Sequence, residues 1–146
     1  VNLRARYDAA QTTAENIKID IGSAYPLEEE TVMEVRGRDM VSGMPRTCKI
    51  SSEEIRDALK DPVNEIVGAT KATLEKTAPE LAGDLIDSGI ILCGGGALLR
   101  GVDKVLAAET GLKVSIADDP MRAVVKGSGF ILDHLPAFKK ARGEEE

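Results

Sequence analysis

The chain has 146 residues and a formal net charge of −6; 42% of its residues are hydrophobic and 3% are aromatic. One domain, or one domain with a small added lobe, fits this length, and without tryptophan the core must be mainly aliphatic. The acidic charge and the few aromatic rings argue against a nucleic-acid groove as the main role. No stretch approaches the ~20 apolar residues of a membrane span, and we expect no signal peptide at the start.

The first predicted element is a helix over residues 2–21, where apolar side chains recur at spacings of three and four. Thr12 followed by Glu15 has the spacing of a capping box, which leaves open two helices with a break near Gln11. The sequence begins without Met inside this helical pattern. We therefore expect a fragment or an excised piece of a longer chain.

A β-hairpin is predicted after the polar linker that follows this helix. Residues 31–39 alternate between polar and apolar, so that Met33 and Val35 share an apolar face. The segment 41–45, VSGMP, is typical of a turn, and residues 46–50 return as a second strand.

A long helix is predicted to begin at residues 51–54, SSEE, where a serine cap is followed by carboxylates. Apolar residues continue at helical spacing as far as Leu74. Pro62 falls inside this run and should kink the helix or split it in two. Pro79 then opens a short helix that extends to Ile86.

The second half of the chain is predicted as strand, glycine turn, helix, strand and helix. Its first strand is the apolar run Ile90–Cys93, which suits burial on both faces in a parallel sheet. A helix over 97–110 follows, closed by Gly111, and then a strand over 114–116. This βαβα order makes the strands parallel and places the glycine turn at the carboxyl end of a strand.

The C-terminal part adds a last helix, capped by residues 118–120 and running through Leu132, and a solvated tail. His134 has no plausible nucleophile nearby in the sequence, so we do not expect it to be catalytic. Cys48 and Cys93 have no second Cys or His at ligand spacing. Two free thiols are therefore predicted, and no metal site.

Three glycines, Gly94, Gly95 and Gly96, stand together at the end of the first parallel strand. Each costs a regular element about 1 kcal/mol, so something must approach the main chain closely there. Ligands of open α/β sheets lie at this edge, and main-chain N–H groups of such a turn can line a site. A dinucleotide fingerprint fails because Leu99 stands where a glycine is needed, and no Gly-Lys-Ser/Thr of a P-loop follows. A tight turn packed on the sheet remains the alternative.

The segment from this turn onward resembles the adenosine motif of the actin-like ATPase superfamily, in the form ILCGGGALLRGVDKVLAAETGLKVSIADDPMRAVVKGSG. The closer resemblance is to the MreB family of bacterial actin homologues. Upstream, TAENIKIDIGSAYPLEEETVMEVRGRDMVSGMPRTCKISSEEIRDAL is similar to the smaller lobe of the same family, and the resemblance covers residues 12–135.

The resemblance implies an α/β fold, a fragment of an actin-like ATPase domain. Residues 1–88 would form an α+β smaller lobe with a β-hairpin and helices. Residues 89–138 would form part of a ribonuclease H-like sheet in βαβα order, with the adenosine-motif turn. Residues 139–146 would form a solvated tail.

The resemblance also implies a set of cofactor-binding residues: Glu15, Lys18, Gly94, Gly95, Gly96 and Ala97. The glycine turn would lie against adenine and ribose, and Glu15 and Lys18 would reach them from one face of a helix. The carboxylate would accept from ribose hydroxyls while the lysine stem covers the purine. The cofactor of the intact protein would be ATP or ADP with Mg²⁺.

Catalytic and metal-binding residues are not expected in this chain, because the two phosphate-binding glycine turns of the family and its catalytic-water residue have no counterpart here. The loop over residues 7–12 is also shorter than in the family. Nucleotide binding by this chain alone is therefore expected to be weak or absent, and ATP hydrolysis negligible.

The implied function is that of part of an ATP-binding bacterial protein that polymerises into filaments, organises cell-wall synthesis and maintains rod shape. The expected partners are further copies of itself and the cell-wall elongation machinery, in the cytoplasm, without nucleic acid and without direct membrane contact from this segment. A nucleotide-independent assembly module is the alternative, with the hairpin 31–50 and the helix 52–77 as protofilament surfaces. A relative of sugar or acetate kinases is less favoured, since those enzymes need the same missing phosphate turns.

Overall fold

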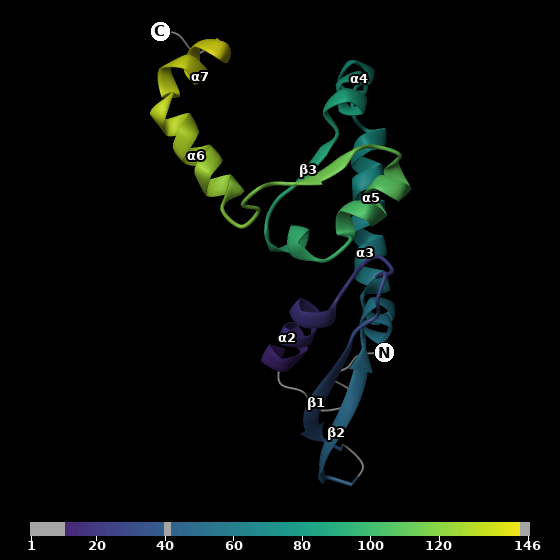
Figure 1. Cartoon of the computed structure of the whole chain (residues 1–146). Coiled ribbons are helices and arrows are strands. Elements are labelled where there is room, and N and C mark those ends of the chain that lie inside the picture. Colours follow the sequence, from purple (N-terminus) through teal and green to yellow (C-terminus); the bar gives the residue numbers. More distant parts are fainter. Residues whose placement is uncertain (1–10, 40–41, 144–146) are drawn as a thin grey trace.

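The computed structural model describes residues 11–39 and 42–143, and one long helix links its two small sheets (Figure 1). The described elements, in chain order, are α2 (Gln11–Ile21), β1 (Val32–Arg38), β2 (Pro45–Ser51), α3 (Ser52–Glu75), α4 (Pro79–Ser88), β3 (Ile90–Leu92), the 3₁₀ helix η1 (Gly95–Leu98), α5 (Val102–Thr110), β4 (Val114–Ile116), α6 (Ala123–Asp133) and α7 (Leu135–Ala141). The hairpin lies at one end of α3, and the parallel pair β3–β4 lies beside the other half of that helix (Figure 1).

The predicted hairpin is present, with β1 and β2 antiparallel and Met33 opposite Ile50. Its predicted apolar face is also present: Val35 is buried and Met33 is half-buried, whereas their neighbours along β1 are exposed. Pro45, predicted as part of the turn, is instead the first residue of β2, a position where its missing N–H is tolerated.

The capping box predicted at the start of α3 is formed in both directions. The Glu54 N–H donates to Ser51 Oγ over 3.2 Å, and the Ser51 N–H donates to the Glu54 carboxylate over 3.1 Å. The predicted split at Pro62 is wrong, because α3 is a single helix through that residue. Proline removes one backbone bond, but side chains on both sides of it are buried, and this packing holds the helix together.

Two apolar clusters share α3. The hairpin cluster consists of Ile17, Ile21, Val35, Ile50 and Ile55, and the sheet cluster consists of Val63, Val67, Val102 and Leu106. Leu59, halfway between them on α3, packs against both. One helix thus fixes α2 and the hairpin relative to β3, β4 and α5.

The parallel pairing of β3 with β4 is as predicted, with Ile91 opposite Ser115. The prediction that the first strand is buried on both faces is wrong, because Ile91 is 68% exposed. Leu92 and Val114 pack on the sheet cluster from the opposite face of the pair. Helix α5 packs on that face of the strand pair and not on the face that bears Ile91. The βαβ unit therefore has one packed side and one open side.

Two predicted helix starts need correction. The helix expected from residue 97 begins at Val102, because Gly101 is left-handed and a 3₁₀ turn precedes it; its predicted close at Gly111 is present. The last helix begins at Ala123 without a side-chain cap, so the predicted cap at residues 118–120 is wrong. There the chain makes a turn in which the Arg122 N–H donates to the Asp119 carbonyl over 3.1 Å.

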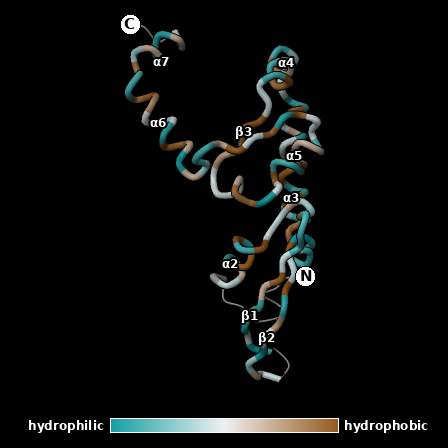
Figure 2. The backbone as a smooth tube through the Cα atoms, viewed as in Figure 1, coloured by the Kyte–Doolittle hydropathy of each residue, from teal (hydrophilic) through white to brown (hydrophobic). Residues whose placement is uncertain are grey.

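The helix predicted before Gln11, its break there and the last three tail residues lie outside the described residues. Hydrophobic stretches are visible at β3 and within α6 (Figure 2), and α6 includes exposed residues such as Phe130 and Leu132. None of the helices within 11–39 and 42–143 combines the length and the apolar character needed to cross a membrane.

Candidate functional site

The glycine turn leaves the carboxyl end of β3 in a conformation that requires glycine. Gly94 has φ 81° and ψ 177°, a region essentially closed to residues with a side chain. Its N–H donates to the Pro120 carbonyl over 2.7 Å, and its carbonyl accepts from Ala97 N–H over 3.2 Å. These bonds join the turn after β3 to the segment after β4, as expected for the carboxyl edge of a parallel sheet.

Gly95 and Gly96 are not required by the backbone, since neither has a positive φ. Among the described residues, a Cβ added at Gly96 would meet no atom within 4 Å, and one at Gly95 would meet only the Met121 sulfur, 3.4 Å away. The backbone conformation therefore accounts for Gly94. The predicted alternative, a turn packed tightly on the sheet, accounts for none of the three glycines, since a Cβ added at Gly94 also meets no described atom within 4 Å. Ala97 is buried, so the turn has one packed side and one open side.

Glu15 and Lys18 both lie exposed on α2. A neighbouring face of this helix carries Ile17 and Ile21, which are 1% and 6% exposed and belong to the hairpin cluster. Burial of these isoleucines fixes the rotation of α2 about its axis, so that the acid and the base stay in solvent. Within the described part of the chain, no hydrogen bond or ion pair engages either side chain.

The end of α2 is joined to the chain that follows the glycine turn. Ser23 and Arg100 form a parallel bridge, in which the Ala24 N–H donates to the Arg100 carbonyl over 2.8 Å. The Arg100 side chain donates from Nη2 to the Asp20 carbonyl, also over 2.8 Å. Asp20 lies near Lys18 in the sequence, and Arg100 lies near Ala97. The bridge and the Arg100–Asp20 hydrogen bond therefore connect the helix that bears Glu15 and Lys18 to the chain that follows the glycine turn. In Figure 1, α2 and the turn after β3 lie on the same side of α3.

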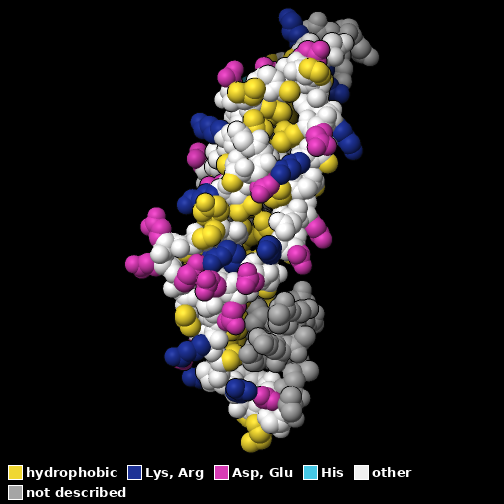
Figure 3. All heavy atoms as spheres, turned by 90° about the vertical axis from the view of Figure 1, so that its right-hand side faces the viewer, with side chains coloured by type: hydrophobic (Ala, Val, Ile, Leu, Met, Phe, Trp, Pro, Cys, Tyr) yellow, Lys and Arg dark blue, Asp and Glu magenta, His cyan; other side chains and the backbone are white. Residues whose placement is uncertain are grey.

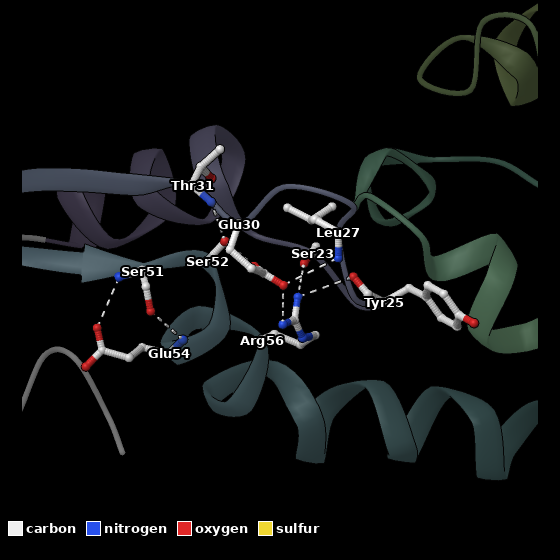
Figure 4. Close-up of polar contacts among 9 residues, drawn as sticks. All are labelled: Ser23, Tyr25, Leu27, Glu30, Thr31, Ser51, Ser52, Glu54 and Arg56. Atoms are coloured by element: carbon white, nitrogen blue, oxygen red, sulfur yellow. Dashed lines mark hydrogen bonds and ion pairs between the residues drawn. The ribbon is translucent and has the colours of Figure 1, made fainter.

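A polar network holds the loop between α2 and β1 against α3 (Figure 4). Arg56 donates from Nη2 to Glu30 over 2.6 Å, and from Nη1 to Ser23 Oγ over 3.2 Å and to the Tyr25 carbonyl over 3.4 Å. The Ser52 hydroxyl donates to the second oxygen of Glu30. Bonds from Arg56 and then Ser52 lower the pKa of Glu30, so this carboxyl stays ionised beside the guanidinium.

Sequence reasoning missed Arg100, Met121 and Pro120 as parts of this region. Met121 was findable, because the carboxyl ends of parallel strands meet at one edge, and the segment after β4 therefore had to lie beside the glycine turn. Arg100 carried no local signal, since its contact spans 80 positions in the sequence. The predicted free thiols are present at Cys48 and Cys93. In the part of the chain described, no three His, Cys, Asp or Glu residues are grouped to hold a metal ion.

Comparison with known proteins shows the family to which this chain belongs. The sequence model described as MreB/Mbl protein matches residues 3–140. The chain belongs to the MreB/Mbl family. Similar relatives include the cell shape-determining protein Mbl of Bacillus cereus, 48% identical over 130 residues, which are 89% of this chain and 39% of that protein. The cell shape-determining protein MreB of Escherichia coli K12 is 47% identical over 125 residues, 86% of this chain and 36% of that protein.

Solved structures share the fold of this chain. MreB5 of Spiroplasma citri bound to ADP superposes with a TM-score of 0.85 at 39% identity, over 96% of this chain and 43% of that one. A MamK double helical filament gives a TM-score of 0.61 at 20% identity, over 82% of this chain and 36% of MamK. The predicted actin-like α/β fold is therefore confirmed. The chain spans about two fifths of the length of the curated relatives it matches.

Proposed function

We propose that this chain forms the adenosine side of a nucleotide site in a filament-forming, cell shape-determining MreB/Mbl protein of the bacterial cytoplasm. The observation that carries the proposal is the open glycine face at residues 95–96, where, in the part of the chain that the structure describes, an added Cβ would meet only the Met121 sulfur. The turn that bears this face is joined to the helix bearing Glu15 and Lys18. MreB5 of Spiroplasma citri, which has this fold, has been solved with ADP and with AMPPNP.

The chemistry of the residues fits a nucleoside. A surface without side chains at Gly95 and Gly96 admits the flat purine or the ribose close to the main chain. The Glu15 carboxylate can accept from two neighbouring hydroxyls, and the four-carbon stem of Lys18 can cover a ring while its ammonium stays in water. The Met121 thioether beside Gly95 offers a soft, polarisable contact for an aromatic ring.

Phosphate and Mg²⁺ contacts are assigned by this proposal to other parts of the whole protein. Charge-assisted bonds to phosphate are roughly twice as strong as neutral ones, so they supply most of the affinity for ATP or ADP. The chain is therefore expected to bind ADP weakly. AMP and adenosine should bind with similar strength, because the contacts formed here do not reach beyond the ribose.

Binding is tested by titrating ADP, AMP and adenosine into isotope-labelled chain and following backbone amide signals by NMR. Residues 15–18 and 94–97 should shift together. Glu15→Gln should weaken the binding of all three ligands about tenfold, which is the loss expected when a hydrogen bond to a charged group is removed. Glu65→Gln, at an exposed glutamate of α3, is the matched control and should leave binding unchanged. Titrations that change amide signals elsewhere but not those of residues 15–18 or 94–97 would refute the proposal.

A second proposed role, self-assembly, follows from the charges on the hairpin and on α4, which lie at opposite ends of the fold (Figure 1). Arg36, Arg38 and Lys49 lie exposed on one face of the hairpin. Lys49 pairs with Glu34 over 3.8 Å, and Arg38 donates from Nε to the Gly43 carbonyl over 2.8 Å. Three exposed acids, Glu80, Asp84 and Asp87, recur at helical spacing on α4. Figure 1 places α4 and the hairpin at opposite ends. A basic end and an acidic end favour head-to-tail association of identical chains.

Assembly is tested by sedimentation at rising concentration, with and without ADP. Arg36→Glu and Asp84→Lys should each reduce association, and the double variant should regain part of it. If neither substitution changes the concentration dependence of sedimentation, the contact between chains lies elsewhere on the molecule. Partners in the cell-wall elongation machinery belong to the whole protein and are proposed for it on the family assignment alone.

A further inference from the structure

The chain segment after α2 and the segment after the glycine turn fit against each other with almost no space between their backbones. A Cβ at Gly101 would lie 2.6 Å from the Tyr25 Cβ and 3.3 Å from the Tyr25 nitrogen, so the two segments leave no room for a side chain at this glycine. Ser23, in the first of these segments, is fully buried. We call residues 22–25 with 100–101 the seam. Its close fit makes the relative position of the two segments sensitive to any contact that spans it.

Within the described chain, Arg100 spans the seam through a side-chain hydrogen bond, and the Lys104 ammonium of α5 lies 5.8 Å from the centroid of the Tyr25 ring. The Arg100 guanidinium reaches the Asp20 carbonyl in the last turn of α2 over 2.8 Å. Carbonyls in this turn lack partners within the helix, and the helix dipole makes its end negative, so a cation there is favourable. The Arg100 carbonyl meanwhile accepts from Ala24 N–H. The side chain of Arg100 thus holds Asp20, and its backbone carbonyl holds Ala24, just beyond the end of α2.

The same loop is held from α3 by a separate set of contacts. Arg56 bonds Ser23 and Tyr25, and Glu30 secures Arg56. These bonds fix the loop to α3 but do not reach the chain around the glycine turn. Arg100 is the described side chain that connects the α2 end directly to that turn, so loss of its donor would leave the loop docked while loosening α2 relative to Gly94–Gly96.

We infer that Arg100 is a positioning residue for the nucleoside. It sets the separation between the α2 face that bears Glu15 and Lys18 and the open face of Gly95 and Gly96. The inference rests on the proposed function, because it assigns a role in binding that a purely structural contact would not have. Arg100 itself lies at the helix end and touches Asp20, so its effect on the ligand is indirect.

The test replaces the guanidinium in the 146-residue chain and measures ADP binding and thermal stability together. Arg100→Met keeps an unbranched apolar stem and removes the donors of the guanidinium, and Arg100→Lys restores a charged donor. Arg46→Ala is the control, an exposed arginine of the hairpin that pairs with Asp39 away from the seam. ADP is titrated while amide signals of residues 15–18 and 94–97 are followed by NMR.

Arg100→Met should weaken ADP binding about tenfold, and residues 94–97 should still shift while the shifts of residues 15–18 shrink. Arg100→Lys should recover part of the affinity, and Arg46→Ala should match the parent. A purely structural role predicts a lower melting temperature with unchanged affinity of the folded chain, and that result would overturn the inference. If Arg100→Met does not fold, Arg100→Gln, whose side chain is too short to reach Asp20, is measured in its place with the same expectation.

The two proposals fail differently. A parent chain in which ADP moves neither segment would remove the proposed nucleoside site, and the role of Arg100 with it. A parent chain that binds ADP, with an Arg100→Met variant that binds it equally well and shifts both segments, would overturn the positioning role alone.

Discussion

Alanine at Gly101 and alanine at Gly96 should have opposite effects on the stability of the chain. Gly101 has φ +73°, and its added Cβ would lie 2.6 Å from Tyr25 Cβ and 3.3 Å from Tyr25 N. A left-handed alanine costs about 1–2 kcal/mol, and the overlap adds to this because neither Tyr25 atom can rotate away. We expect a loss of about 2 kcal/mol or more, which lowers the melting temperature of a chain of this size by about 4–8 °C or more.

Gly96→Ala should stabilise the chain. The backbone there has no positive φ, and the new Cβ would meet no atom of residues 11–39 or 42–143 within 4 Å. Alanine restricts the unfolded chain, which is worth about 0.4–1 kcal/mol, so the melting temperature should rise by about 1–4 °C. The methyl group would occupy the face assigned to the nucleoside. Because overpacking costs about 1–3 kcal/mol, ADP should bind about tenfold more weakly.

Circular dichroism gives the melting temperatures, and the NMR titration gives the affinities. Gly68→Ala is a matched control, because a Cβ at this glycine of α3 also meets open space; it should raise stability and leave ADP binding unchanged. Gly96→Ala that binds ADP like the parent would refute the assignment of the open glycine face to a ligand. An unchanged melting temperature for Gly101→Ala would refute the close fit of the seam.

Three further results are expected. The pKa of Glu30 is lowered from its usual 4.5, so its charge stabilises the fold above that pH and ceases to do so as pH falls through the lowered pKa. In urea unfolding, the parent should therefore exceed Glu30→Gln in stability at neutral pH, with a gap that narrows below pH 4.5. Pro62→Ala should raise the free energy of unfolding by up to about 3 kcal/mol, by restoring a helical bond; no gain would mean that α3 is already relaxed around Pro62. The chain with ATP and Mg²⁺ should release no phosphate above the blank, and metal-dependent turnover would contradict this.

Local signals in the sequence were enough for the hairpin and for the start of α3. Alternation fixed the face of Val35, and the Ser51–Glu54 pair forms its cap within four residues. The continuity of α3 through Pro62 was not predictable locally, because it depends on packing against both apolar clusters. The exposure of Ile91 was missed for a similar reason: an apolar run shows that a strand can be buried, not what covers it.

The candidate site shows the same limit. The glycine turn and its place at the carboxyl edge followed from βαβ order. The start of α5 was misplaced, since its position depends on the left-handed Gly101 fitting against Tyr25, a contact between distant segments. Arg100 was missed because arginine in a polar turn has no distinctive pattern, and only the fold brings it to the end of α2.

Intermolecular NOEs between bound ADP and the labelled chain would test the nucleoside site most directly. Protons of adenine and ribose should give cross-peaks to the Hα atoms of Gly95 and Gly96 and to side-chain protons of Glu15 and Lys18. Cross-peaks confined to other residues, with none from the glycine turn, would contradict it.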